Sequence, residues 1–468
     1  MTADLLITDV EVINVDGRQR GHVAVTGRRI SAVLPLDAQL PEARKTLDGQ
    51  GRLALPGGVD GHCHIAQRTG AYDTLDTYAT TSVAALWGGT TTLLDFGIPR
   101  DEVQTPLQAL QRKRELAHES RCDIGLHGSV IQWDDSIPEQ LNSMWAMGVR
   151  SVKMYATNRG TTMADPDTML NVMHEVATRQ GLVYLHAEHD AMVVDCTKRH
   201  ADAGEIGVGH LHRTRPEIVE ESSVQELLAM VEYTGVRAYF VHQTTPRSVS
   251  LVTDARAAGL DVYSETCPHY LTLDDSVYEG TIPECYSCCP PMRSRRTVDG
   301  LAKKAAAGNI DALSSDHSCY DLRQKREHRD DIRRMPHGLP GVETRLPVSY
   351  TKLVNELEMP LERFVSTFST EPARINGLQF KGAIKEGMDA DIVLIDPVQT
   401  RAVTSAQLHM GTDFSPFEGM DLHGWPQAVI SNGRVVVCEG EFEDPGPTGR
   451  YLHRQSMAGP VPDEERAR

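Results

Sequence analysis

The stretch "LPGGVDGHCHI" (residues 55–65) decides the fold, because it is a strand-like run that ends in two histidines. Side chains two positions apart on a strand point the same way, so His62 and His64 present their imidazoles on one side while Cys63 faces away. Seven similar β-rich runs follow, at residues 90–96, 122–130, 149–155, 182–188, 237–243, 260–266 and 310–317. Helix-like stretches, such as residues 105–120 and 166–181, lie between them.

This alternation predicts an α/β chain with a (β/α)8 TIM-like barrel, although periodicity alone leaves a doubly wound sheet open. Both chain ends instead alternate in the manner of strands, as in "DADIVLIDP" (389–397). We therefore expect a catalytic barrel over residues 55–380 and one small β-sandwich domain built from residues 1–54 and 381–450. Residues 451–468 lack periodicity and are expected to form a tail that is mobile unless a neighbouring subunit holds it.

The composition is that of an ordinary soluble globular protein, with 40% hydrophobic and 24% charged residues. A formal net charge of -18 argues against nucleic acid and against an anionic membrane as partners. No apolar run approaches the length of a membrane span, and the N-terminus lacks the pattern of a signal peptide. Nine scattered cysteines fit reduced thiols better than a disulfide framework, so we expect a cytoplasmic protein.

Polar side chains stand at the ends of five of the eight predicted strands, where a barrel places its catalytic residues. They are His62, His64, Lys153, His186, His242 and Asp316. Any one of them alone would be interpreted as structural: a hydrogen-bonded histidine, an ion-paired lysine or a helix cap. Four imidazoles and a carboxylate at one rim have the composition of a metal site, and their convergence favours the barrel over the doubly wound sheet.

Lys153 is the unexpected member of this set. An ammonium beside divalent cations is electrostatically unfavourable, because like charges repel strongly in a dry site. Carbamylation of the amine by carbon dioxide would make it an anionic carboxylate with two oxygens, able to bridge two metal ions. The presence of a lysine among these histidines therefore points to a modified Lys153.

Eight motifs occur in the order and spacing of the cyclic amidohydrolases: "PGGVDGHCH", "SVKMY", "YLHAEHD", "YFVHQTT", "YSETCPHYL", "CCPPMRS", "SSDH" and "DADIVLID". The chain resembles the dihydropyrimidinase and hydantoinase branch of that family over nearly its whole length, residues 4–445. The resemblance implies two Zn2+ ions per subunit. By position, His62, His64 and Asp316 would bind one ion, His186 and His242 would bind the other, and N6-carboxylated Lys153 would bridge them.

The resemblance also implies a mechanism and an assembly. Two divalent ions lower the pKa of a bridging water, and the resulting hydroxide attacks the carbonyl carbon of a small cyclic amide, ureide or imide. Asp316, as general acid/base, takes a proton and passes it to the leaving nitrogen, so the C–N bond opens. A homotetramer, or a dimer, is the expected assembly.

Three positions depart from the pattern of that branch, and all three are substrate-facing there. Asn158 replaces a tyrosine that stabilises the developing oxyanion, Cys289 replaces a serine, and His337 replaces an asparagine that contacts the substrate ring. The natural substrate is therefore expected to be neither dihydrouracil nor a simple hydantoin. Ala66 occupies the place of an arginine that is typical of dihydroorotases, which leaves an allantoinase or a cyclic imide hydrolase as alternatives.

Other classes of protein share this barrel. Collapsin response mediator proteins are non-catalytic assembly proteins that have lost metal ligands, whereas all six positions are intact here. Mononuclear deaminases do not need the lysine of the fourth strand, so Lys153 argues against them. His269 is interpreted as structural, and the C-x-x-C spacing of Cys285 and Cys288 lacks the second pair of a zinc finger.

Overall fold

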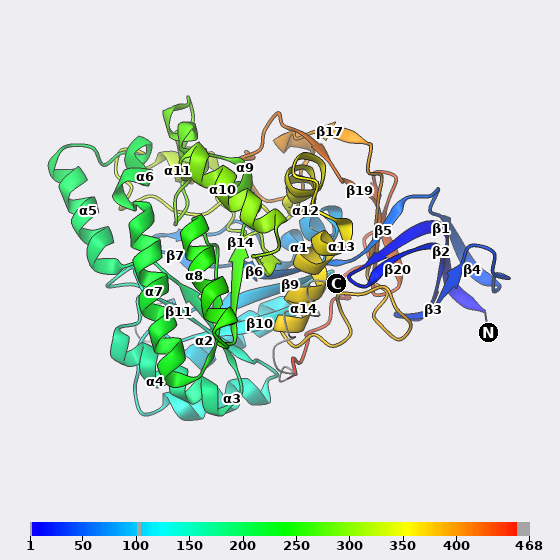
Figure 1. Cartoon of the computed structure of the whole chain (residues 1–468), viewed down its shortest axis with the longest axis horizontal. Helices are drawn as coiled ribbons and strands as arrows, with labels where there is room; N and C mark the ends of the chain where they lie inside the picture. Colours follow the sequence, from blue (N-terminus) through cyan, green and yellow to red (C-terminus); the bar gives the residue numbers. More distant parts are fainter. Residues whose placement is uncertain (1, 101–103, 456–468) are drawn as a thin grey trace.

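The structure, a computed structural model, describes residues 2–100 and 104–455. Eight parallel strands form its centre, and helices surround them (Figure 1). In chain order around the sheet these strands are β6 (Gly58–Cys63), β9 (Thr90–Gly97), β10 (Asp123–Ser129), β11 (Ser151–Tyr155), β12 (Leu182–His186), β13 (Arg237–Phe240), β14 (Val262–Thr266) and β15 (Ala312–Leu313). The Asp316 N–H donates to the His62 carbonyl at 3.0 Å and so links the last strand to the first. The predicted fold class, a (β/α)8 barrel with an additional sheet, is confirmed.

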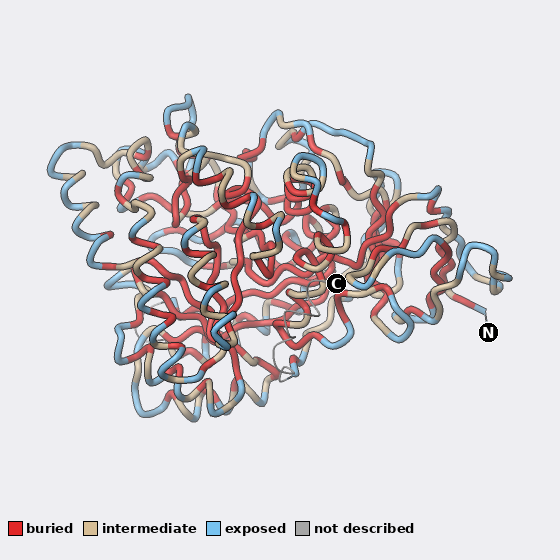
Figure 2. The backbone as a smooth tube through the Cα atoms, viewed as in Figure 1, coloured by how far each residue is buried: buried red, intermediate tan, exposed pale blue. Residues whose placement is uncertain are grey.

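The barrel strands are buried on both faces, as parallel strands covered by helices must be. Every residue of β6, β9, β10, β11 and β12 is buried, and the centre of the molecule is accordingly red in Figure 2. Aromatic rings fill the barrel interior, where Tyr184 and Tyr239 stack with their centroids 4.3 Å apart. The barrel is therefore a packed core, and chemistry is confined to its rim.

A cap followed by proline starts several of the covering helices. Thr105, Asp165 and Thr245 each accept a hydrogen bond from a backbone N–H in the first turn, and a proline follows each of them. The main covering helices are α1 (Tyr78–Trp87), α2 (Pro106–Leu116), α3 (Ile137–Ala146), α4 (Pro166–Thr178), α5 (Asp190–Asp202), α7 (Glu217–Thr234), α8 (Pro246–Ala257) and α10 (Arg295–Ala306). Shorter ones are α6 (Leu211–Thr214), α9 (Pro268–Thr272), α11 (Leu322–Arg326), α12 (Arg345–Ser349), α13 (Leu361–Val365) and α14 (Glu371–Ile375).

The two chain ends meet in a second, nine-stranded sheet beside the barrel (Figure 1). Its N-terminal strands are β1 (Ala3–Asn14), β2 (Gly17–Thr26), β3 (Arg29–Pro35), β4 (Ala43–Asp48) and β5 (Leu53–Pro56). Its C-terminal strands are β16 (Ile392–Ile395), β19 (Pro426–Ser431), β20 (Arg434–Cys438) and β21 (Glu441–Phe442). The two groups join where β5 pairs antiparallel with β16. The boundaries at residues 54 and 381 stay a prediction, since β5 runs almost directly into β6.

A buried network of charges connects the barrel to this sheet. Lys381 donates to Asp123 at 2.6 Å and lies 3.2 Å from Asp389, and it also pairs with Asp391. Arg450 contacts Asp123 and Asp389, each at 2.5 Å. Asp123 belongs to barrel strand β10, so the network joins residues that are far apart in the sequence.

The last described residues lie against the barrel. Leu452 donates its N–H to Ile124 at 2.8 Å, and the Arg454 guanidinium reaches the Leu126 carbonyl at 2.5 Å and the Ser151 hydroxyl at 2.7 Å. Of the predicted tail, residues 451–455 are thus bound to the barrel, and residues 456–468 lie outside the described part of the chain. None of the helices in the described ranges combines the length and apolarity that crossing a membrane requires.

Candidate active site

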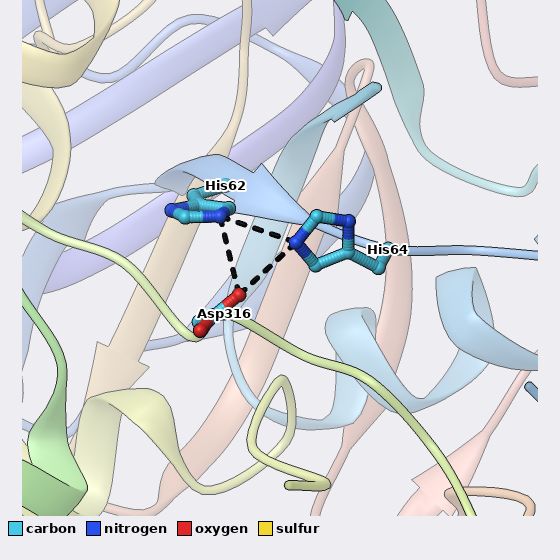
Figure 3. Close-up of side chains that lie close together, drawn as sticks. All are labelled: His62, His64 and Asp316. Atoms are coloured by element: carbon cyan, nitrogen blue, oxygen red, sulfur yellow. Dashed lines mark hydrogen bonds and ion pairs between the residues drawn. The ribbon is translucent and has the colours of Figure 1, made fainter. Parts of the chain in front are cut away.

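Two histidines and an aspartate meet at one rim of the barrel (Figure 3). His62 lies near the end of β6, His64 follows that strand, and Asp316 follows β15. The Asp316 carboxylate is 3.1 Å from Nε2 of His62 and 3.2 Å from Nε2 of His64, and the two Nε2 atoms are 3.2 Å apart. Three ligand-type atoms that converge in this way could hold one cation.

A second pair of imidazoles continues the same cluster. His186 is the last residue of β12, and His242 lies two positions beyond the end of β13. Nε2 of His242 is 2.9 Å from Nδ1 of His186, and the His242 ring centroid is 5.5 Å from that of His62. The structure therefore brings together all four histidines that the sequence places at strand ends.

Lys153 lies within this cluster without a partner. Its side chain is fully buried, and among the described residues no acceptor forms a hydrogen bond with its Nζ atom. Nζ lies over the rings of Phe96 and Tyr155, whose centroids are 5.2 and 5.0 Å away. Burial lowers the pKa of Lys153 to about 8, which favours the neutral, nucleophilic amine that reacts with carbon dioxide. An unpaired buried amine fits modification to a metal-bridging carboxylate.

Two buried glutamates orient the imidazoles from behind. Glu265, in β14, accepts a hydrogen bond from Nδ1 of His62 at 2.7 Å and from the His242 backbone N–H at 3.0 Å. Glu188 accepts from Nε2 of His186 at 2.8 Å. Because a carboxylate accepts here, each of these ring nitrogens carries the proton, and the opposite nitrogen offers a lone pair to the site.

Burial keeps the imidazoles in the form that binds metal ions. It lowers the pKa of His64, His186 and His242, because the charged form loses its hydration. Metal ions bind the neutral form of imidazole, so the lowered pKa values favour the form of these side chains that can coordinate a metal ion at neutral pH.

Three site residues have backbone conformations that side chains rarely adopt. His242, Asp316 and Asn158 have φ angles of 37°, 49° and 71°. Strain of this kind costs roughly 1–3 kcal/mol per residue and persists only where surrounding contacts impose it. Hydrogen bonds from the backbone of His242 to Glu265 and from that of Asp316 to strand β6 are such contacts.

Arg215, which no sequence pattern indicated, contacts one of the three predicted substrate-facing positions and influences the pKa of the side chains at the other two. Arg215 donates to Glu188 at 2.5 Å and to Oδ1 of Asn158 at 3.4 Å. Burial and the charge of Arg215 lower the pKa of His337 to about 3. Burial raises the pKa of the Cys289 thiol to about 11, and the charge of Arg215 opposes this rise. Arg215 thus links Asn158 directly to Glu188, which accepts a hydrogen bond from His186.

Two other clusters of ligand-type residues are fully occupied by hydrogen bonds or cations. The first cluster consists of Asp76, His317 and Cys319. Nε2 of His317 donates to Asp76 at 2.8 Å and Nδ1 accepts the Gly341 N–H at 3.1 Å, so both ring nitrogens already have partners. The second consists of the three carboxylates that already surround Lys381. The rim cluster at His62 is therefore the candidate metal centre among the described residues.

The family follows from a comparison with known proteins. Residues 53–436 match the sequence profile of the amidohydrolase family. The chain belongs to the amidohydrolase family. This family implies that divalent metal ions bind, and the amidohydrolase described here has a rim cluster that suits them.

Relatives of this amidohydrolase match it from end to end. A D-hydantoinase of Ralstonia pickettii is 31% identical over 460 residues, which cover 97% of this chain and 99% of that protein. The crystal structure of dihydropyrimidinase from Brevibacillus agri has a TM-score of 0.94 at 30% identity and covers 97% of this chain and 99% of its own. An L-hydantoinase of Arthrobacter aurescens has a TM-score of 0.87 at 26% identity, over 97% and 100% of the two chains. The predicted resemblance to this branch, and the prediction of an enzyme of the cyclic amidohydrolase class, are confirmed.

Two glutamates that contact the rim histidines were not predicted from the sequence. Glu188 and Glu265 both occur inside quoted motifs, "YLHAEHD" and "YSETCPHYL". Glu188 comes two positions after His186, a spacing that could have identified it. No local pattern marks Arg215. His269, interpreted as structural, has a buried Nε2 atom for which the described residues supply no hydrogen-bond partner.

Proposed function

We propose that this amidohydrolase opens a cyclic amide, ureide or imide by hydrolysing one C–N bond. The observation that carries the proposal is the unpaired, buried Nζ atom of Lys153. It lies over the rings of Phe96 and Tyr155, and these rings contact His62, His64 and His186 of the rim cluster. A structural cluster would pair this amine with a carboxylate. The names of the relatives, hydantoinases and a dihydropyrimidinase, support this class of substrate.

The proposed cofactor is a pair of Zn2+ ions. His62, His64 and Asp316 would hold one ion, His186 and His242 the other, and N6-carboxylated Lys153 would bridge them. When bound, the ions lower the pKa of water and polarise a carbonyl group. The lone pairs that Glu265 and Glu188 direct into the site fit this role.

The side chains of the protein then move protons and hold the substrate. Asp316 takes a proton from water at a carboxylate oxygen and returns it to the leaving nitrogen, so water adds across the C–N bond. Oδ1 of Asn158 accepts a hydrogen bond from Arg215 at 3.4 Å, and Nδ2 donates one hydrogen to the Thr162 hydroxyl at 3.5 Å. The second Nδ2 hydrogen would stabilise negative charge on the substrate oxygen.

His337 gives a specific reason to favour ureides and imides. Its Nε2 atom donates to the Ile332 carbonyl at 2.8 Å, so Nδ1 is an acceptor, and this atom is buried without a partner among the described residues. Because burial keeps this imidazole neutral, Nδ1 would accept an N–H group of the substrate. Hydantoins, allantoin and cyclic imides all carry such a group next to a carbonyl.

The proposal also includes a cytoplasmic homotetramer or dimer. All nine cysteines are free of disulfide bonds, which supports a reducing compartment. The assembly rests on the resemblance alone, and light scattering of the purified chain would measure it.

A turnover screen tests the proposed function. Zinc-loaded protein is offered hydantoins, dihydropyrimidines, allantoin, dihydroorotate and cyclic imides, and metal content is measured in parallel. Lys153→Ala should lose bound metal and activity together, whereas Lys303→Ala, at an exposed lysine of α10, should retain both. Full turnover by Lys153→Ala would refute the bridging role.

A further inference from the structure

Lys325 is another buried lysine, and it lies outside the metal cluster. Its Nζ atom donates to the Ser287 carbonyl at 2.8 Å, to the Ser287 hydroxyl at 2.8 Å and to the Gly338 carbonyl at 2.6 Å. The side chain is fully buried, and among the residues that the structure describes no carboxylate forms an ion pair with it. The three donors of the ammonium are thus matched by three neutral oxygens from two loops.

The two loops are also connected directly. The Gly338 N–H donates to the Ser287 carbonyl at 2.9 Å, and the Ser287 hydroxyl donates to the Pro336 carbonyl at 3.1 Å. A side chain at Gly338 would place its Cβ atom 2.6 Å from Cβ of Ser318, so this loop is in close contact with its other neighbour as well. Lys325 therefore lies at the junction of two closely fitted loops.

These loops carry two of the three substrate-facing positions. Cys289 is two residues beyond Ser287, and His337 immediately precedes Gly338. Arg215 and Glu188, which form an ion pair at 2.5 Å, both influence the pKa of each of these side chains. We therefore expect movement of either loop to change the positions of Cys289 and His337.

We propose that Lys325 is a positioning residue that holds Cys289 and His337 at a fixed separation and thereby sets which cyclic amide fits the pocket. This inference rests on the proposed function, because it takes the two positions to face the substrate. The hydrogen bonds of Lys325 within the described residues go to Ser287 and Gly338, and neither of these is a proposed metal ligand.

The cost of the arrangement supports a positional role. A buried ammonium without a carboxylate partner destabilises the folded protein, and burial lowers the pKa of Lys325 to about 8. An apolar side chain would fill the space at lower cost, but it could not tie two carbonyl groups together. A lysine at this position is explained if the separation of the loops matters.

The test compares Lys325→Met and Ser287→Ala with the surface control Lys303→Met. Cys196 and Cys438, the other partly exposed thiols, are changed to serine in all proteins so that iodoacetamide reports on Cys289. We expect Lys325→Met to keep its metal content and kcat, to raise KM by about tenfold, and to alkylate Cys289 about tenfold faster. Ser287→Ala removes one of the three contacts of Lys325 and also the hydrogen bond to the Pro336 carbonyl, so it loosens the same junction and should change both quantities in the same direction by a smaller factor.

Two results would overturn the proposal. One is an unchanged KM and an unchanged alkylation rate in Lys325→Met with full metal content. The other is a fall in kcat with KM unchanged, which would place Lys325 in the chemical step. If Lys325→Met does not fold, Ser287→Ala decides the matter by the same two measurements.

The alkylation rate also separates this inference from the proposed function. If the wild-type protein hydrolyses no cyclic amide, the proposed function fails, and the reactivity of Cys289 still shows whether Lys325 holds the loops. If the protein is active but neither measurement responds to the variants, only the positioning role fails.

Discussion

Replacing Lys153 with methionine should stabilise the metal-free protein. In wild-type protein freed of metal and carbon dioxide, the Lys153 ammonium is fully buried and no described residue pairs with it. Several kcal/mol is the effective penalty for an unpaired buried ion in a real protein. Methionine has a similar length and no charge, so Lys153→Met removes this penalty.

The magnitude follows from the surroundings of Nζ. The ammonium gains roughly 0.5–2 kcal/mol from the faces of Phe96 and Tyr155, and a methionine sulfur gains about 0.3–1.5 kcal/mol from the same rings, so these contributions nearly cancel. We expect a net increase of about 2–4 kcal/mol in the free energy of unfolding. For a chain of this length the increase corresponds to about 2–4 °C in Tm.

Differential scanning calorimetry in a chelator and bicarbonate-free buffer measures the effect. Lys303→Met, at an exposed position, should change the stability by less than about 0.5 kcal/mol. With zinc and bicarbonate the order should reverse, because only the wild-type protein gains the free energy of metal binding. If metal-free Lys153→Met is no more stable than metal-free wild type, the reasoning is refuted, because the buried ammonium then does not destabilise the fold.

Three further predictions concern the supports of the site and of the fold. Lys381→Met leaves the three carboxylates around it with too few cations and should lower the free energy of unfolding by about 3–5 kcal/mol in urea titrations. Burial raises the pKa of Asp123, but Lys381 and Arg450 outweigh it and hold that pKa well below its ordinary value. The resulting stability is present above about pH 4 and is lost as the pH falls further, so Asp123→Asn should be less stable than wild type at pH 7 by a margin that shrinks in acid. Glu265→Gln no longer fixes the proton on His62 and should weaken zinc binding by about 10–100-fold in competition with a chelating dye, whereas unchanged affinity would contradict the orienting role.

Much of the rim could be predicted from local patterns. A strand has a period of two, so "HCH" after a buried run places two imidazoles on one side wherever the strand lies. In a barrel of parallel strands the carboxyl ends share one rim, so His186, His242 and Asp316 could be assigned to the same place from their positions in the runs. Lys153 could be included for the same reason, because it lies within the fourth run.

The partners of these residues could not be predicted in that way. His62 and Glu265 are 203 positions apart, and Arg215 reaches Asn158 across 57 positions. The chain has 65 acidic and 47 basic residues, and nothing local separates the few that become buried from the many that stay in water. Arg454, in the predicted tail, contacts Ser151 across 303 positions.

The sequence by itself determined the number of barrel strands, the rim on which the histidines gather and the chemical type of the site. These features depend on the two-residue period of strands and on the direction of parallel strands, which are local properties. Only the tertiary structure decided which glutamates orient the imidazoles, that Lys153 is left without a partner, and that Lys325 joins the loops of Cys289 and His337. Such pairings arise when the barrel closes and buries polar groups, because most of these groups then bind to whichever partner the fold places beside them, and Lys153 is an exception.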